Sequence, residues 1–184
     1  LLLRPGWAED APALHAAIAD EGIVRNLATA PWPYRMSDAE AFLSREPGPG
    51  HSCLIYRRTH GAPQLVGGVG FGPMPDSDEF ELGYWIARQS WGLGYATEAA
   101  RAMIANARHT LRLKRLHAGH FLDNPAPGRV LEKIGFSPPG EIARRYSAGP
   151  RAEAPCKLYA LDLAPLPADK EEEPSLVEAF CMAA

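Results

Sequence analysis

The sequence has few cysteines, no long apolar run and little net charge, and each absence excludes a class of protein. Its three cysteines are Cys53, Cys156 and Cys181. Their wide spacing and odd number argue against a disulfide framework and predict reduced thiols, as in a cytoplasmic protein. No apolar run approaches the roughly 20 residues that a membrane span requires, so no membrane association is expected.

The charge and the histidines exclude two further classes of site. A formal net charge of −3 lacks the clustered excess of Lys and Arg that nucleic-acid binding needs, so no nucleic-acid partner is expected. His117 and His120 are three residues apart in a predicted strand, where side chains alternate between opposite faces, so they do not form a metal pair. We therefore expect no metal.

What is present predicts one globular domain. A length of 184 residues, with 46% hydrophobic and 22% charged residues, is typical of a single soluble domain. Hydrophobic periodicity, turn residues and capping patterns predict helices after Asp10, from Ser37, at 95–111 and at 125–134, and strands at 1–3, 52–58, 64–71, 80–87, 116–122 and 158–163. This order predicts an α/β (α+β) fold around one mixed sheet, with the domain at 1–164 and a polar, acidic tail at 165–184.

The sharpest local feature is the loop QSWGLG at 89–94, between a predicted strand and a predicted helix. The first N–H groups of a helix have no partner within the helix, and the helix dipole places partial positive charge there. Gly92 and Gly94 lack a Cβ, so the backbone can approach an anion closely. The loop matches neither the dinucleotide fingerprint nor the P-loop, and alone it predicts a generic phosphate site about as well as an ordinary turn. The second glycine cluster, at 67–72, fails both patterns too and predicts a close-packed strand with a turn at Gly72 and Pro73.

With its flanking motifs, this loop resembles the GNAT acyltransferase superfamily, and in particular its RimJ/RimL-type branch. Gln89, Gly92 and Gly94 fill the family pattern Gln/Arg-x-x-Gly-x-Gly/Ala. The sequences that carry the resemblance to the branch are APWPY at 30–34, ELGYWI at 81–86, WGLGYATEA at 91–99, DNPA at 123–126 and VLEKIGF at 130–136. The resemblance covers roughly residues 3–163.

The resemblance implies a mostly antiparallel mixed sheet, splayed open at its centre and flanked by helices, with the strand 80–87 bulged beside 116–122. It also implies that the cosubstrate is acetyl-CoA. The residues implied to bind it, through backbone groups around the pantetheine arm and the pyrophosphate, are Trp85, Ile86, Gln89, Gly92, Leu93, Gly94, Tyr95 and Ala96, with Asn124 and Arg129 beside the coenzyme.

The catalytic residues implied by the resemblance are Glu81 and Asn124. Glu81 is the candidate base, acting through water, or else a solvent-facing strand residue. Asn124 is a candidate cofactor contact, or else the N-cap of the helix that follows. The sequence departs from the branch at Pro127, where the family has Ser, and Leu131 stands where relatives carry a Tyr general acid. Either the thiolate then leaves unaided or protonated by water, or one of Tyr95, Tyr146 and Tyr159 protonates it, or catalysis is weak.

The expected function is transfer of an acetyl group from acetyl-CoA to a primary amine by direct attack in a ternary complex. The acceptor is either a protein N-terminal α-amine or a small-molecule amine, and the protein is a monomer or a homodimer. Trp32 and Tyr34 are candidates to cover the acceptor, with Glu81, or else they are core aromatics. The alternative is an acyl-CoA binding or sensing module that retains the loop but has little turnover, which the absence of a hydroxyl at Pro127 favours.

Overall fold

The computed structural model describes residues 1–46, 48–74 and 77–163. The elements, in chain order, are β1 (Leu2–Arg4), η1 (Ala8–Asp10), α1 (Ala11–Ile18), α2 (Glu21–Val24), α3 (Met36–Leu43), β2 (His51–Arg57), β3 (Gln64–Pro73), β4 (Phe80–Ile86), η2 (Arg88–Ser90), α4 (Tyr95–His109), β5 (Arg115–Phe121), α5 (Ala126–Lys133), β6 (Ile142–Ser147) and β7 (Ala152–Asp162). The predicted tail at 165–184, and Cys181 within it, lie outside the described residues. Cys53 and Cys156 are free thiols.

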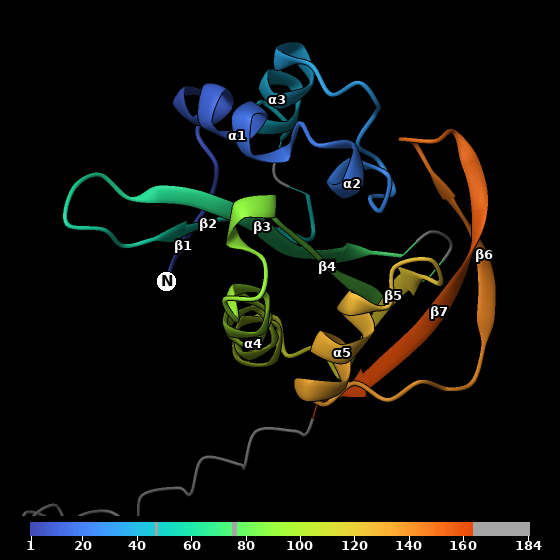
Figure 1. Ribbon diagram of the computed structural model, residues 1–184. Helices are drawn as coiled ribbons and strands as arrows, with labels where there is room; N and C mark the ends of the chain where they lie inside the picture. The colour runs from blue at the N-terminus through green and yellow to red at the C-terminus, as the bar shows by residue number, and fades with distance from the viewer. Residues whose placement is uncertain (47, 75–76, 164–184) are drawn as a thin grey trace, which may run out of the picture.

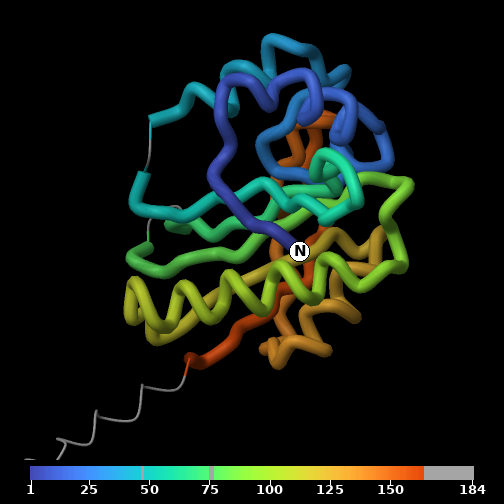
Figure 2. Tube along the Cα trace, turned by 90° about the vertical axis from the view of Figure 1, so that its left-hand side faces the viewer, coloured from blue at the N-terminus to red at the C-terminus, as the bar shows by residue number. Residues whose placement is uncertain are grey.

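One seven-stranded sheet in the order β1-β2-β3-β4-β5-β7-β6 organises these elements. All neighbouring strands are antiparallel except β4 and β5, which are parallel. Helices α1, α2 and α3 cover one face, and α4 and α5 cover the other, as both views of the chain show (Figures 1 and 2). The predicted mixed, mostly antiparallel sheet flanked by helices is therefore confirmed.

Each face of the sheet has its own core, because side chains alternate along the strands. The core beneath α4 and α5 includes Leu116, Leu131 and Tyr159, all at most 1% exposed. The core beneath α1 and α3 includes Leu14 and Val24. Since apolar burial is the main favourable term in folding, the two cores hold the two helical layers on the sheet independently.

The sheet opens at its centre. Strands β4 and β5 pair only at Phe80 with Leu116 and at Glu81 with His117. Beyond Glu81 the two strands diverge, so within the described chain the edge of β4 that faces β5 carries unpaired backbone groups. The splay is thus confirmed. The expected bulge in β4 is wrong, because its register against β3 is regular and the irregularity lies between β2 and β3, at Ile55 and Tyr56.

Several local predictions needed correction. Helix α3 begins one residue earlier than predicted, and its capping carboxylate is Asp38, which accepts the backbone N–H of Arg35 at 2.7 Å. The predicted turn at Gly72 and Pro73 is absent because β3 continues through Pro73. Helix α2 and strand β6 were not predicted at all. Gly135 takes a left-handed φ of 101° after α5, as a helix-ending glycine should.

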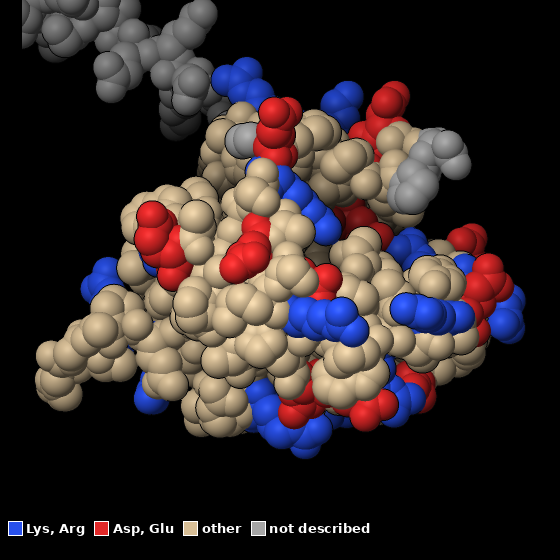
Figure 3. Space-filling model, turned by 90° about the horizontal axis from the view of Figure 1, so that it is seen from above, with Lys and Arg blue, Asp and Glu red and all other residues tan. Residues whose placement is uncertain are grey.

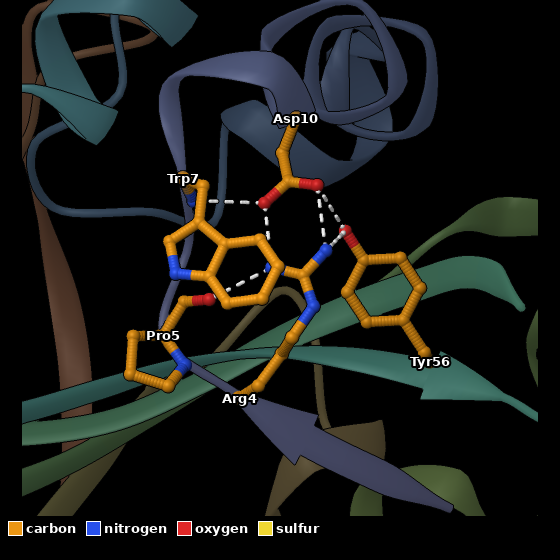
Figure 4. Close-up of polar contacts among 5 residues, drawn as sticks. All are labelled: Arg4, Pro5, Trp7, Asp10 and Tyr56. Atoms are coloured by element: carbon orange, nitrogen blue, oxygen red, sulfur yellow. Dashed lines mark hydrogen bonds and ion pairs between the residues drawn. The ribbon is translucent and has the colours of Figure 1, made fainter.

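A buried ion pair joins β1 to the first helical segment and to β2. Arg4 donates to both carboxylate oxygens of Asp10 at 2.7 Å, and Asp10 also accepts the Tyr56 hydroxyl at 2.7 Å and the Trp7 backbone N–H at 2.8 Å (Figure 4). These donors favour the ionised form, so the Arg4 guanidinium lowers the pKa of Asp10 to about 2. This cluster fixes the start of α1 on the sheet.

Candidate active site

The loop between β4 and α4 has the geometry of an anion site. Gly92 and Gly94 adopt left-handed φ angles of 76° and 81°, which only glycine adopts at little cost. Among the described residues, no backbone partner is found for the N–H groups of 92–97, and the first to bond is that of Glu98, to the Gly94 carbonyl at 3.1 Å. A free row of N–H groups at the start of a fifteen-residue helix favours a phosphate.

The side chains around this loop hold it in place. The Trp91 indole N–H donates to the Ile86 carbonyl at 2.7 Å, and Arg88 lies 5.0 Å above the Trp91 ring. Arg88 also pairs with Asp20 at 2.7 Å, which holds the pKa of Asp20 below its usual value. These contacts tie the loop both to the end of β4 and to the α2 segment. Gln89, a candidate binding residue, lies exposed in η2.

The open edge of β4 leads from this loop toward the centre of the sheet. Trp85 and Ile86, whose backbone groups are predicted to pair with an extended, amide-bearing ligand, both lie on this strand. The Trp85 carbonyl faces Gly67 of β3. The Ile86 carbonyl already accepts the Trp91 N–H, which leaves it one lone pair for a ligand. An anion site and an unpaired strand edge are therefore continuous along one path.

A cavity of about 350 Å³ lies between the sheet and the layer that α1 and α3 form. Residues from α1, α3, the segment 27–34 and strands β2, β3 and β4 line it. The Trp85 indole forms one wall, and it lies across β3 because Gly68 has no side chain: a Cβ there would be 2.5 Å from the indole nitrogen. Seen from this side, the surface is hollowed, and acidic and basic side chains are interspersed around the hollow (Figure 3).

Glu81, Gly83 and Trp85 alternate onto this same face of β4. Gly83 and Trp85 line the cavity, and Glu81, the candidate base, is the next residue along this face, just outside the lining. Glu81 is engaged by Arg145 of β6, whose Nη1 lies 2.5 and 2.6 Å from its two oxygens. The two side chains are 27% and 29% exposed, respectively. The sequence does not predict a role for Arg145, because strand β6 is not predicted and no motif around Arg145 indicates a functional site.

Tyr84 points to the opposite face, toward the first turn of α5. Its hydroxyl donates to the Pro127 carbonyl at 3.1 Å, and burial raises the pKa of the phenol. A protonated phenol therefore lies beside Pro127, the position at which the RimJ/RimL-type branch has Ser.

The three tyrosines considered from the sequence lie elsewhere. Tyr159 is 1% exposed and donates to Glu132, whereas Tyr146 is 53% exposed on β6. Tyr95 begins α4 and is half-buried. The sequence signal for Tyr84 was its place inside the motif ELGYWI.

Asn124 is not the N-cap of α5. The N-cap position is Pro125, with no side-chain cap, and the Asn124 backbone N–H donates to Phe121 in a turn at 3.0 Å. Among the described residues no hydrogen bond is found for its half-buried side chain, so that amide is available to a ligand. Arg129 is exposed on α5.

The two aromatic residues expected over the acceptor differ in their surroundings. Tyr34 is 7% exposed, lines the cavity and stacks on His15 with ring centroids 6.4 Å apart. Trp32 is half-buried and packs against the core beneath α1 and α3.

Within the described ranges no group of His, Cys, Asp or Glu is arranged to hold a metal ion. No helix in that part of the chain is long and apolar enough to cross a membrane.

Comparison with known proteins agrees with this geometry. A family model described as an acetyltransferase (GNAT) domain matches residues 1–137. The uncharacterised N-acetyltransferase YoaA of Bacillus subtilis is 30% identical over 152 residues, which is 79% of this chain and 84% of YoaA.

Solved structures share the fold. The spermidine N-acetyltransferase of Vibrio cholerae, solved in complex with CoA and spermine, superposes with a TM-score of 0.70 at 17% identity, covering 88% of this chain and 94% of that one. The ribosomal-protein-alanine N-acetyltransferase of Brucella melitensis superposes with a TM-score of 0.69 at 22% identity, covering 89% of this chain and all of that one.

Proposed function

Because this chain belongs to the GNAT family of N-acetyltransferases, we propose that it transfers the acetyl group of acetyl-CoA to a primary amine. The observation that carries the proposal is the continuous path from the free N–H groups at 92–97, along the open edge of β4, to the cavity beside Glu81. The pyrophosphate would bind the loop, with Leu93, Tyr95 and Ala96 as further contacts and Gln89 beside them. The pantetheine would extend along Trp85 and Ile86.

The chemistry proposed is direct attack of a neutral amine on the thioester carbonyl. The amine nitrogen forms the new C–N bond, the C–S bond breaks, and the amine's excess proton must leave while the thiolate gains one. Glu81 is the proposed base, acting through water. Arg145 is the proposed positioning residue, since its contact with both oxygens fixes the carboxylate.

Three side chains near α5 are proposed to face the coenzyme: Tyr84, Asn124 and Arg129. The Tyr84 hydroxyl has a single proton, which it donates to the Pro127 carbonyl in this structure. We propose that it turns this proton to the departing thiolate when the coenzyme is bound, supplying the donor that Pro127 lacks. A thiol with a pKa near ~8.5 is a tolerable leaving group, so a hydrogen bond rather than full proton transfer suffices. Asn124 and Arg129 are proposed to contact the coenzyme from the same side.

The resemblance of the motifs at 30–34, 81–86, 91–99 and 123–136 supports placing the chain in the RimJ/RimL-type branch, whose acceptors are α-amines of proteins. A protein or peptide α-amine has a pKa of ~7.7–8.0, against ~10.4 for a lysine side chain, and is therefore the easier nucleophile for a weak base. The likeness to the spermidine enzyme, at 17% identity, concerns the fold and does not favour polyamines.

The test is thiol release from acetyl-CoA against a panel of peptides and small amines, with acetyl-CoA binding measured separately by calorimetry. Amine-dependent thiol release supports the proposal. Tight acetyl-CoA binding with no release for any amine supports the alternative, a sensing module, which the missing hydroxyl at Pro127 favours. If turnover is absent, Pro127→Ser should restore it, and failure to do so removes the argument for that alternative.

A further inference from the structure

Resting on the proposed acetyl transfer, we infer that the acceptor is a primary amine attached to a bulky apolar group and carries no second cationic centre. The cavity beside β4 is the site of that apolar group. Its chemistry, the placement of its charged residues and an open position in its floor each support this assignment.

Apolar side chains form most of the cavity wall. Leu14 and Ile18 contribute from α1, Phe42 from α3, and Leu54 and Trp85 from the sheet. A volume of about 350 Å³ is in the range of sites for small organic ligands, which typically span about 300–1,000 Å³. An apolar group placed there leaves water for an apolar surface, which is favourable in proportion to the area buried.

The charged residues of the lining are Asp38 and Arg45, both contributed by α3 or the residues directly after it. The Asp38 carboxylate accepts the backbone N–H of Arg35, and the exposed Arg45 guanidinium lies 5.4 Å from the centroid of the Phe42 ring. The β4 end of the cavity, at Gly83 and Trp85, contributes no charge. A second ammonium group in the cavity would therefore have only the Asp38 carboxylate as a partner. The positive charge of Arg45 nearby offsets the negative charge of that carboxylate.

This arrangement disfavours a polyamine. A desolvated ammonium is costly unless it is paired and hydrogen-bonded, and each cationic centre of a polyamine needs its own partner. One amine placed beside Glu81 with an apolar body in the cavity meets both conditions. The amine then reacts at the β4 end while its apolar group fills the space toward α3.

Gly83 keeps the floor of the cavity open. It is exposed in the middle of the sheet, and a Cβ added there would meet no atom within 4 Å apart from its chain neighbours. Because β4 is otherwise regular at this position, a methyl group on Gly83 would take space from the cavity without colliding with the protein. Alanine at this position is therefore a direct probe of what the cavity holds.

The experiment compares acceptors within two arms at saturating acetyl-CoA, by thiol release. One arm uses phenethylamine, ethylamine and spermidine, and the other uses peptides that begin with Phe or with Gly. We expect the apolar member of at least one arm to have a kcat/KM at least about tenfold higher than its partners. A preference seen only among the small amines identifies the acceptor as a small molecule. A preference seen only among the peptides identifies it as a peptide N-terminus.

Ethylamine or spermidine matching phenethylamine, together with the Gly peptide matching the Phe peptide, would overturn the inference and leave the acetyl-transfer proposal standing. Absence of turnover with every amine would instead contradict the proposed function. Calorimetric binding of phenethylamine and of the Phe peptide to the protein–CoA complex then tests the cavity without turnover. A Kd at least about tenfold lower than that of ethylamine or of the Gly peptide is expected, and equal affinities would overturn the inference.

Gly83→Ala gives the second test, with Gly61→Ala as its control. Gly61 is exposed in the turn between β2 and β3, a Cβ there would meet only the Thr59 hydroxyl oxygen at 4.0 Å, and Gly61 does not line the cavity. We expect Gly83→Ala to lower kcat/KM for the preferred apolar acceptor about tenfold and that for ethylamine less than threefold, with Gly61→Ala changing neither. An equal fall for both acceptors in Gly83→Ala, or no fall for the apolar one, would overturn the assignment of the cavity.

Discussion

Nη1 of Arg145 lies 2.5 and 2.6 Å from the two carboxylate oxygens of Glu81, although 64 residues separate them in the sequence. The contact bridges the centre of the sheet, where β4 begins to diverge from β5, to the outermost strand β6. The contact holds the Glu81 carboxylate in one orientation, and the opposite charges of the two side chains offset each other beside the acceptor position.

Glu81→Gln should lower kcat by about 10²-fold, because general bases contribute at least about that much. The amide keeps the size of the side chain and loses the capacity to accept a proton. The acetyl-CoA Kd, measured by calorimetry, should stay within about twofold, since the proposed coenzyme path uses backbone groups further along β4 and not the Glu81 side chain. A fall in kcat of less than threefold would mean that Glu81 is only a structural partner of Arg145.

Tyr84→Phe should lower kcat about tenfold while the acetyl-CoA Kd stays within about twofold, because it removes one hydrogen bond to the departing thiolate. Burial raises the pKa of Tyr84, so the phenol stays protonated and the effect should be the same from pH 7 to pH 9. Tyr159→Phe is the matched control, since that hydroxyl is committed to Glu132 at 3.1 Å. Equal losses in the two variants would argue against a role for Tyr84 at the sulfur.

Gly94→Ala should raise the acetyl-CoA Kd by about tenfold or more. Gly94 has a φ of 81°, and a side chain there costs about 1–2 kcal/mol even though a Cβ would meet no atom within 4 Å. Relaxing the strain would turn the N–H groups of the loop away from the anion. Gly61→Ala, at an exposed position between β2 and β3 without positive φ, should leave the Kd unchanged. An unchanged Kd in Gly94→Ala would place the pyrophosphate elsewhere.

The geometry of the loop at 89–94 could be predicted from the sequence because its physical requirements are local, whereas its role in binding stays a prediction. Positive φ at Gly92 and Gly94 and the start of α4 follow from neighbouring residues. The Arg145–Glu81 pair was not readable, since it depends on the register of β6, a strand with no clear alternation whose pairing with β7 is set by the tertiary structure. The N-cap alternative for Asn124 is wrong by one residue, because Pro125 itself takes the N-cap position. The alternative role of Asn124, as a contact to the coenzyme, stays a prediction.

Asp10→Asn should lower the free energy of unfolding by about 2 kcal/mol at pH 7, which is the size of a pKa shift from 3.8 to about 2. A depressed carboxyl pKa stabilises the fold above pH 3.8, and the contribution is lost as the pH falls toward 2. The difference from the unmodified protein should therefore vanish in that window, as followed by urea unfolding. Asp123→Asn, which breaks an exposed pair with Arg25, should cost less than about 1 kcal/mol. An Asp10→Asn penalty that persists unchanged at pH 2 would contradict the ion-pair account.

The central claim is tested most directly by following acetyl-CoA consumption and acetylated amine in the same reaction. Mass spectrometry of the amine and thiol titration of released CoA should give one acetylated product per CoA released, with both rates falling together in Glu81→Gln. Tight acetyl-CoA binding without product from any amine, or thiol release without an acetylated amine, would contradict the account.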